Sequence, residues 1–227
     1  HMGIELGFKV PLPVQGPSVE GALSWGEYIY TSTPRMTQTV DNSAEVVHDN
    51  APVPYWASHP IYKKYADADG TVVYETDADG NWIVEKTQKH YVPSTPQLAA
   101  DLGFNYRTNS YWFFEIDAQY FANSYLDMNP GYRTDHAVNG PDGVFTPVEV
   151  EYMAAQEKFK PVFLLNASIG KSWYIDRKYN FGFSLNLQNI TNNKCVKTGG
   201  YEQTRLIDSK SAERYYRFDS KYFYMQG

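Results

Sequence analysis

Six short segments of this chain alternate between apolar and polar residues. Within residues 97–107, for example, Leu98, Leu102 and Phe104 alternate with Asp101 and its polar neighbours. Because successive side chains of a β-strand point to opposite faces, each segment predicts a strand with one apolar and one polar face. We expect strands at Gly3–Val10, Ser18–Tyr30, Gln97–Arg107, Tyr111–Phe121, Val162–Trp173 and Phe181–Gln188.

The links between these segments alternate strictly between short and long. Short links lie at residues 11–17, 107–110 and 176–178, whereas residues 31–94 and 123–160 form long polar stretches, and residues 189–227 are again polar and irregular. An up-and-down antiparallel sheet places successive links at opposite edges, so the short links share one edge. Outer-membrane β-barrels have this asymmetry, and loops beyond about 12–15 residues are uncommon in compact soluble domains.

The composition of the two faces supports the same interpretation. The expected apolar face places Trp or Tyr toward the strand ends, as in interfacial aromatic girdles, at Trp25, Tyr106, Trp112, Tyr120 and Trp173. The polar face predicts lumen-lining residues at Asp101, Asn105, Glu115, Asp117, Gln119, Asn166, Asn186 and Gln188. The sequence therefore predicts an all-β, antiparallel up-and-down transmembrane β-barrel segment of about six strands of a larger barrel.

Composition excludes several other classes of protein. The net charge is −6 and no cluster of Lys or Arg forms a basic patch, so we expect no nucleic-acid partner. No apolar run approaches the roughly 20 residues that a membrane-spanning helix needs. The single cysteine, Cys195, excludes an internal disulfide framework.

An Asp-Ala-Asp-Gly string occurs twice, at residues 67–70 and 77–80. Acidic oxygens at alternate positions suit Ca²⁺, but the first string has Ala78 where an EF-hand loop requires its bidentate Glu. Asp-Gly pairs also favour tight hairpin turns, here between residues 71–76 and 81–87. We expect turns, with a calcium site as the alternative.

The sequence gives little support for an enzyme or for a bound metal. Four histidines are scattered through the expected loops without metal-ligand spacing: His48, His59, His90 and His136. Glu115 and Asp117 share a face and could form an acid–base pair, but we expect them to be lumen-lining polar residues instead. We therefore expect no enzymatic activity, no catalytic residue, no metal site and no cofactor.

The long stretches contain aromatic side chains that are suited to stacking on a sugar or a peptide. The substrate-binding candidates in these loops are Trp56, Trp82, Tyr91, Tyr125, Tyr132 and Arg133. Packing that holds a long loop in shape is the alternative role for each of them.

Several strings in the chain carry a family resemblance. They are HMGIEL at 1–6, DNSAEVV at 41–47, YLDMNP at 125–130, LQNITNNK at 187–194, KTGGYEQTR at 197–205 and YFYMQG at 222–227. Together they resemble TonB-dependent outer-membrane receptors of the carboxypeptidase-regulatory-like branch, and LQNITNNK is similar to a segment near the end of those receptors.

The resemblance implies a barrel of about 22 strands, with a plug domain inside it, in the outer membrane of a Gram-negative bacterium. It also implies uptake of a small nutrient, such as a siderophore, vitamin, glycan or peptide, energised by the TonB complex. We expect residues 1–227 to be the C-terminal part of such a receptor, without the plug domain and the closing strand. The expected partners are the receptor's own N-terminal plug, the TonB complex, outer-membrane lipid and the nutrient.

Two other functions remain open from the residues alone. The first alternative is a soluble extracellular β-domain that binds a glycan or a protein, with its polar face in solvent. The second is a secreted β-rich hydrolase that uses Glu115 and Asp117.

Overall fold

The computed structural model describes residues 1–39, 44–93, 95–135, 138, 146–176, 178–195, 201–202 and 223–224. The chain divides into two compact units. Unit 1 comprises residues 1–28, 94–125 and 158–197, and unit 2 comprises residues 29–93, 126–157 and 198–227. The expected strands belong to unit 1, and much of the two long stretches belongs to unit 2.

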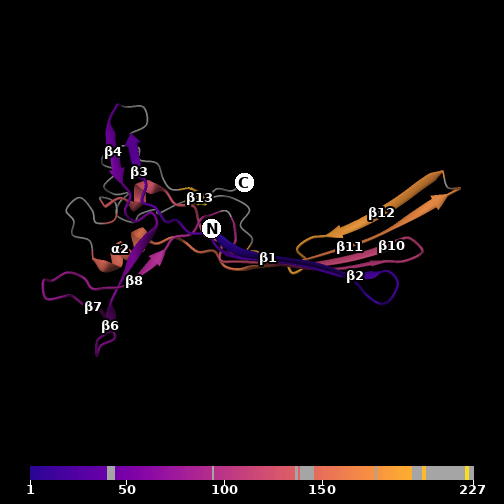
Figure 1. The fold of residues 1–227 in the computed structure, drawn as a ribbon, viewed down its shortest axis with the longest axis horizontal. Coiled ribbons are helices and arrows are strands. Elements are labelled where there is room, and N and C mark those ends of the chain that lie inside the picture. Colours follow the sequence, from indigo (N-terminus) through magenta and orange to yellow (C-terminus); the bar gives the residue numbers. More distant parts are fainter. Residues whose placement is uncertain are drawn as a thin grey trace. The chain divides into compact units, whose positions relative to one another are not determined.

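Unit 1 is one six-stranded antiparallel sheet with the strand order β1-β2-β9-β10-β11-β12 (Figure 1). Its strands are β1 (Met2–Pro11), β2 (Pro17–Glu27), β9 (Leu98–Arg107), β10 (Trp112–Ala122), β11 (Val162–Ile175) and β12 (Tyr179–Leu187). Each strand pairs with the strand before it among these six, as in an up-and-down sheet. The mostly-β fold, the six expected strands and their antiparallel order are therefore confirmed.

The second strand is shorter than predicted, since β2 ends at Glu27 rather than Tyr30. The backbone N–H of Tyr28 donates to Oε1 of the Gln97 side chain at 2.6 Å. A side-chain acceptor has replaced the neighbouring strand's carbonyl at this point, so the regular ladder ends there.

The three short links lie at the same end of the strands. Residues in two of these links suit the backbone geometry found there. Gly16 has a φ of 110°, and a Cβ there would lie 2.3 Å from the carbonyl oxygen of Arg107, so only glycine fits. In the β9–β10 link, the Oγ1 of Thr108 accepts from the N–H of Trp112 at 3.0 Å. The Thr108 contact fixes the register of β9–β10 at its turn, and Gly16 lets the β1–β2 link pass close to the end of β9.

The sheet is open. Among the described residues, β1 pairs only with β2 and β12 pairs only with β11 in this sheet. Both edge strands therefore carry backbone groups available for further strand pairing.

Unit 2 differs from the sequence expectation, because the two long polar stretches fold together into short elements. Its elements are β3 (Arg35–Thr39), β4 (Val46–Pro52), β5 (Ser58–Tyr62), β6 (Lys64–Ala66), β7 (Val72–Tyr74), β8 (Val84–Lys89), the 3₁₀-helix η1 (Pro130–Arg133), α2 (Pro147–Ala154), β13 (Tyr201–Glu202) and β14 (Phe223–Tyr224). The strands form two-stranded pairs: β3–β4, β5–β8, β6–β7 and β13–β14. The apolar core of the described part of unit 2 consists of Val53, Leu126, Met128, Val138, Val150, Met153 and Ala154.

Helix α2 contributes three of these core side chains. Pro147 stands at its start, where the missing N–H is not needed, and Val150, Met153 and Ala154 follow at helical spacing and are buried. Glu151 lies between them and accepts from the N–H of Tyr62 and from Lys64 Nζ, each at 2.8 Å. The Glu151 contacts attach α2 to the segment of β5 and β6.

Three backbone segments of unit 2 meet in a cyclic junction. Lys63 N–H donates to the carbonyl of Ile83 at 2.8 Å, Ile83 N–H donates to that of Glu75 at 3.0 Å, and Glu75 N–H donates to that of Lys63 at 2.9 Å. Lys63, Ile83 and Glu75 thus each use their backbone N–H and their carbonyl within this one ring of hydrogen bonds. The pair β5–β8, the pair β6–β7 and the turn at residues 76–82 branch from this junction.

The two Asp-Ala-Asp-Gly strings form turns, as predicted. Asp67 Oδ1 accepts from the N–H groups of Asp69 and Thr71 at 3.0 and 2.8 Å, and Asp77 Oδ1 repeats this with Asp79 and Asn81 at 2.9 and 2.8 Å. The hydrogen bond from the Asn81 backbone, with others, lowers the pKa of the Asp77 carboxyl.

One detail of the hairpin prediction was wrong. The second turn is followed by a single bridge, Thr76 to Trp82, and β8 then pairs with β5 instead of with residues 71–76. The junction at Lys63 ends the hairpin at that point, because its carbonyl and N–H take the partners that a longer ladder would need.

Candidate functional site

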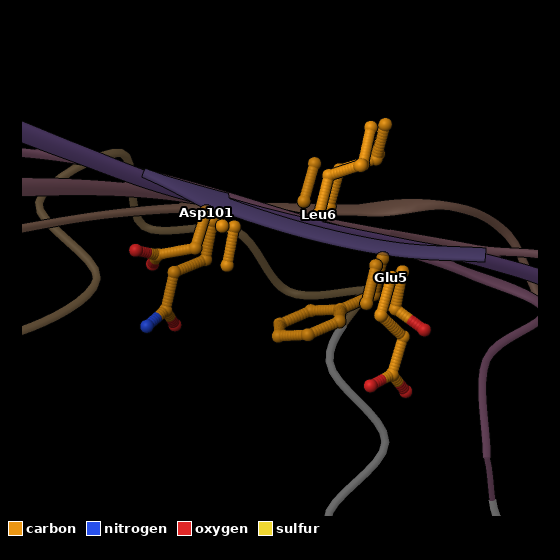
Figure 2. Close-up of a pocket in the computed structure, with 11 residues that line it drawn as sticks. Glu5, Leu6 and Asp101 are labelled. Carbon is orange, nitrogen blue, oxygen red and sulfur yellow. The ribbon is translucent and has the colours of Figure 1, made fainter. Parts of the chain in front are cut away.

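The two faces of the unit 1 sheet differ in chemistry along their whole length. Figure 2 shows Leu6 on one side of the β1 ribbon and Glu5 and Asp101 on the other. Leu6 is 62% exposed and Leu102 is 54% exposed, although both lie on the apolar face. A large apolar face that stays exposed marks an interaction with an apolar partner or with a membrane.

Strand pairing arranges the apolar face in rows that cross the sheet. The two middle rows contain aliphatic residues, Phe and Gly without any Tyr or Trp: Phe8, Gly21, Leu102, Ala118 and Leu165, then Val10, Val19, Phe104, Ile116, Ala167 and Leu187. Tyr and Trp stand in the outer rows. On the long-stretch side these are Trp25 and Tyr120, and on the short-link side they are Tyr106, Trp112, Trp173 and Tyr179.

The spacing between the two aromatic borders has a definite size. In β11, Phe163 pairs with Tyr120 of one border, and Trp173 belongs to the other. Their sequence numbers differ by ten. Ten residues of strand span about 33 Å. With a strand tilt of about 40°, this corresponds to about 25 Å measured within the sheet and perpendicular to the two borders. In β10, Tyr120 is eight residues from Trp112 and six from Phe114, which pairs with Tyr106, so by the same measure the two borders lie about 15–25 Å apart. The longest of these values matches the roughly 25 Å apolar band of outer-membrane barrels.

The short-link border is a continuous aromatic cluster. Trp112 lies 6.2 Å from Phe114 and 6.0 Å from Phe183 between ring centroids, and Trp173 lies 5.9 Å from Phe183. Tyr106 extends the cluster to β9 by stacking on Phe114 at 6.1 Å. Cross-strand aromatic pairs of this kind stabilise a sheet locally.

The polar face carries a network of hydrogen bonds and ion pairs across the strands. Glu20 pairs with Lys9 at 2.8 Å and accepts from Asn105 Nδ2 at 2.9 Å. Glu115 accepts from the Oγ of Ser168 at 3.0 Å and lies 3.9 Å from the guanidinium of Arg107. Hydrogen bonds and ion pairs therefore connect the polar side chains of neighbouring strands on this face.

Strand pairing places the predicted lumen-lining residues on this polar face, with one at its end. Asp101 is opposite Gln119, Glu115 is opposite Asn105 and Ser168, and Ser168 is opposite Asn186. Asp117 is opposite Asn166. Gln188 is exposed and follows the last residue of β12, so it stands beyond the ladder.

A shallow hollow occupies the polar face toward the long-stretch side (Figure 2). Its lining includes Glu5, Ser24, Asp101 and Gln119, together with the ring of Phe121. The remaining lining residues are apolar or glycine, so the carboxylates, the amide, the hydroxyl and the ring border a mostly apolar concave surface: Leu6, Gly7, Ala22, Leu23, Ala99 and Ala100. A polar solute that moves along this face would meet hydrogen-bonding groups and a ring.

The string LQNITNNK ends strand β12 and attaches the following segment to β11. Asn189 and Asn192 have φ values of 50° and 51°, a conformation that asparagine tolerates better than most residues. Asn189 Oδ1 accepts from the N–H of Asn193 at 2.8 Å, and Asn193 Nδ2 donates to the carbonyl of Phe163 at 2.9 Å. These contacts give the asparagines a structural role, because they form the turn after β12 and connect it to the start of β11. Of the strings that carry the resemblance, residues 41–43, 197–200, 203–205, 222 and 225–227 lie outside the described residues.

The loop candidates occupy different environments. Trp56 packs on Tyr30 at 5.0 Å between ring centroids, and Tyr91 is half-buried and exchanges two backbone hydrogen bonds with the Gln156 side chain, each at 2.7 Å. Tyr125, in unit 1, has the ammonium of Lys158 over its ring at 5.8 Å. Trp82 is 44% exposed. The side chain of Tyr132 lies outside the described residues.

Arg133 differs from the other loop candidates because its side chain is buried in unit 2. It is 2% exposed, and its Nη2 donates to the carbonyl of Ala155 at 2.9 Å. The structure thus gives Arg133 a packing contact inside unit 2, and its role in substrate binding stays a prediction. Its carbonyl also accepts from the N–H of Tyr55 at 3.2 Å, which ties η1 to the segment before β5.

A buried histidine pair lies close to this core and was not singled out by sequence analysis. His59 and His90 are 4% and 0% exposed, and His59 Nδ1 lies 2.7 Å from His90 Nε2. His90 Nδ1 lies 2.9 Å from the carbonyl oxygen of Trp56. Since a carbonyl only accepts, His90 Nδ1–H is the donor there, and in the neutral pair His59 Nδ1–H donates to His90 Nε2.

The described residues contain neither a clustered metal site nor a long apolar helix. No group of three or more His, Cys, Asp or Glu side chains among them is arranged to hold a metal ion. Within the same residues, no helix has the length and apolar character to cross a membrane.

Comparison with known proteins finds no match: no family model, curated protein or solved structure is similar to the chain. The likeness to TonB-dependent receptors therefore stays a prediction from the sequence strings.

Proposed function

We propose that the chain forms part of the β-barrel wall of a TonB-dependent outer-membrane receptor that takes up a small nutrient. The observation that carries the proposal is the sorting of residues on the apolar face. Its exposed middle rows contain no Tyr or Trp, and Tyr and Trp border them on both sides at a separation of about 15–25 Å. A bilayer explains both features together, because its core favours aliphatic groups and its interfaces favour Tyr and Trp.

The open edges of the sheet are consistent with this role. A membrane-spanning sheet must pair every strand, since an unpaired backbone group in hydrocarbon costs several kcal/mol. Within the receptor, β1 and β12 would each pair with a further strand of the same barrel. The plug domain and the TonB complex enter the proposal through the family resemblance alone.

The polar face and unit 2 would contact the nutrient. In this arrangement the hollow bordered by Glu5, Asp101 and Gln119 faces the lumen. Unit 2 would form the outer vestibule, where Trp82 offers an exposed indole for stacking on a sugar, peptide or other nutrient.

Membrane extraction tests the proposal. Membranes from cells that express the full-length receptor are washed with alkaline carbonate and then with a mild detergent. We expect the receptor to stay in the membrane pellet through the carbonate wash and to enter solution only with detergent. A soluble glycan- or protein-binding domain would be released without detergent, and that result would refute the membrane assignment.

A further inference from the structure

The apolar face of the sheet carries two charged side chains in its six strands, and they lie at opposite ends. Glu27 of β2 stands on the long-stretch side, and Lys171 of β11 stands on the short-link side. Every other residue of this face in the described strands is uncharged. A cation on an otherwise apolar face needs a specific explanation, because charge on a lipid-facing surface is costly away from the interface.

Aromatic rings hold the Lys171 ammonium in place. Strand pairing sets Lys171 between Trp112 of β10 and Phe183 of β12. Its Nζ lies 5.0 Å from the ring centroid of Trp112 and 5.1 Å from that of Trp173. Two cation–π contacts orient the ammonium within the aromatic border without neutralising its charge.

The charge of Lys171 has no carboxylate counter-ion among the described residues. Two ion pairs of unit 1 join Lys9 to Glu20 and Arg107 to Glu115, both on the polar face. The side chain of Lys171 is half-buried in the aromatic cluster. An anion would therefore have to approach it from outside the sheet, at the level of the border.

The short links beside this border add positive charge. In the sequence, the third of these links contains Arg177 and Lys178 against one carboxylate, that of Asp176, whereas Arg107 of the second link is paired with Glu115 on the polar face. The sequence of the third link is thus net cationic. A basic surface at a membrane interface attracts anionic lipid, at about 1 kcal/mol per Lys or Arg.

We propose that Lys171, held by Trp112 and Trp173, binds the headgroup phosphate of an anionic phospholipid at the membrane interface beside the short links. The inference rests on the proposed function, since it requires the apolar face to contact lipid. The lysine stem lies along the aromatic rings while its ammonium meets the phosphate, which is how long basic side chains behave at interfaces. The acyl chains of the same lipid would cover the exposed middle rows.

Quenching of tryptophan fluorescence by brominated lipids tests this site. The full-length receptor is reconstituted in vesicles of phosphatidylcholine or phosphatidylglycerol, and a variant with Trp112→Phe and Trp173→Phe isolates the signal of these two residues. We expect brominated phosphatidylglycerol to associate about fivefold more strongly than brominated phosphatidylcholine, the ratio that about 1 kcal/mol gives at 25 °C. Lys171→Gln should reduce this ratio to about 1, Lys171→Arg should retain it, and Lys178→Gln serves as the matched control on the exposed link.

The outcomes separate this inference from the proposed function. Equal quenching by the two lipids in the unmodified receptor would overturn the lipid site while leaving the lipid-facing wall intact. A preference that survives Lys171→Gln but disappears with Lys178→Gln would also overturn it. Absence of quenching by either lipid would mean that the face does not contact lipid, and both proposals would fall.

Discussion

Replacing Leu102 by arginine should destabilise the receptor by about 2–4 kcal/mol in lipid vesicles, whereas replacing Asp101 by arginine should change its stability little. Leu102 lies in a middle row of the apolar face, between Gly21 and Ala118, and is 54% exposed in the structure. In the proposed barrel wall this position would lie near the bilayer midplane, where an arginine is most costly. The free energy of unfolding is measured by guanidinium titration of the reconstituted receptor.

The exposure of Leu102 makes this test decisive. Surface substitutions of exposed residues in a water-soluble protein usually change stability by less than about 0.5 kcal/mol. The neighbouring Asp101, on the polar face, is the matched control because it is opposite the same strands. If Leu102→Arg and Asp101→Arg have equally small effects, Leu102 faces water and the membrane assignment is wrong.

Replacing His90 by alanine should destabilise unit 2 locally by about 2–4 kcal/mol, because it leaves a cavity and removes the partner of a buried carbonyl. The carbonyl of Trp56 and Nδ1 of His59 would both lose their contact with the imidazole. Hydrogen exchange followed by mass spectrometry on peptides of residues 55–62 and 86–93 measures the effect. Exchange there should become about 30-fold to 1000-fold faster, since each 1.4 kcal/mol of opening free energy is a factor of ten.

The control for His90→Ala is Gln88→Ala, which removes an exposed side chain two residues earlier in the same segment. It should leave exchange in those peptides unchanged. Peptides of β10 and β11 should be unaffected by either variant, because their hydrogen bonds belong to the unit 1 sheet. Unchanged protection around Trp56 in His90→Ala would show that the histidine pair does not hold unit 2 together.

The unit 1 sheet could be predicted from the sequence because its signal is local and repeated. Strands such as Leu98–Arg107 and Trp112–Ala122 alternate over most of their ten and eleven residues, with apolar exceptions near their ends such as Ala99, Phe113 and Phe121, and the short link between them leaves one plausible pairing. The strand end at Glu27 could not be predicted in the same way. The strand end depends on the side chain of Gln97, which accepts from the N–H of Tyr28 and lies 69 residues after Tyr28 in the chain.

Unit 2 could not be predicted because its core is assembled from distant, irregular segments. The β3–β4 pairing has shifted registers, β6 and β7 have three residues each, and Val53 and Met153 come from different long stretches. In the sequence, His59 and His90 look like scattered loop residues and Arg133 like a substrate contact, and no local pattern predicts that all three are buried. Helix α2 did leave a signal, since Val150, Met153 and Ala154 follow the i, i+3, i+4 spacing after Pro147.

Cysteine labelling in intact cells tests the central claim, that the sheet crosses a membrane with short links on one side and long stretches on the other. In a receptor with Cys195→Ser, one probe replaces Asp69 in the exposed turn between β6 and β7, and another replaces Asn109 in the exposed β9–β10 link. A membrane-impermeant maleimide should label Asp69→Cys in intact cells and Asn109→Cys only after lysis. Equal labelling of both positions in intact cells would contradict the claim, because the two edges of the sheet would then share one aqueous compartment.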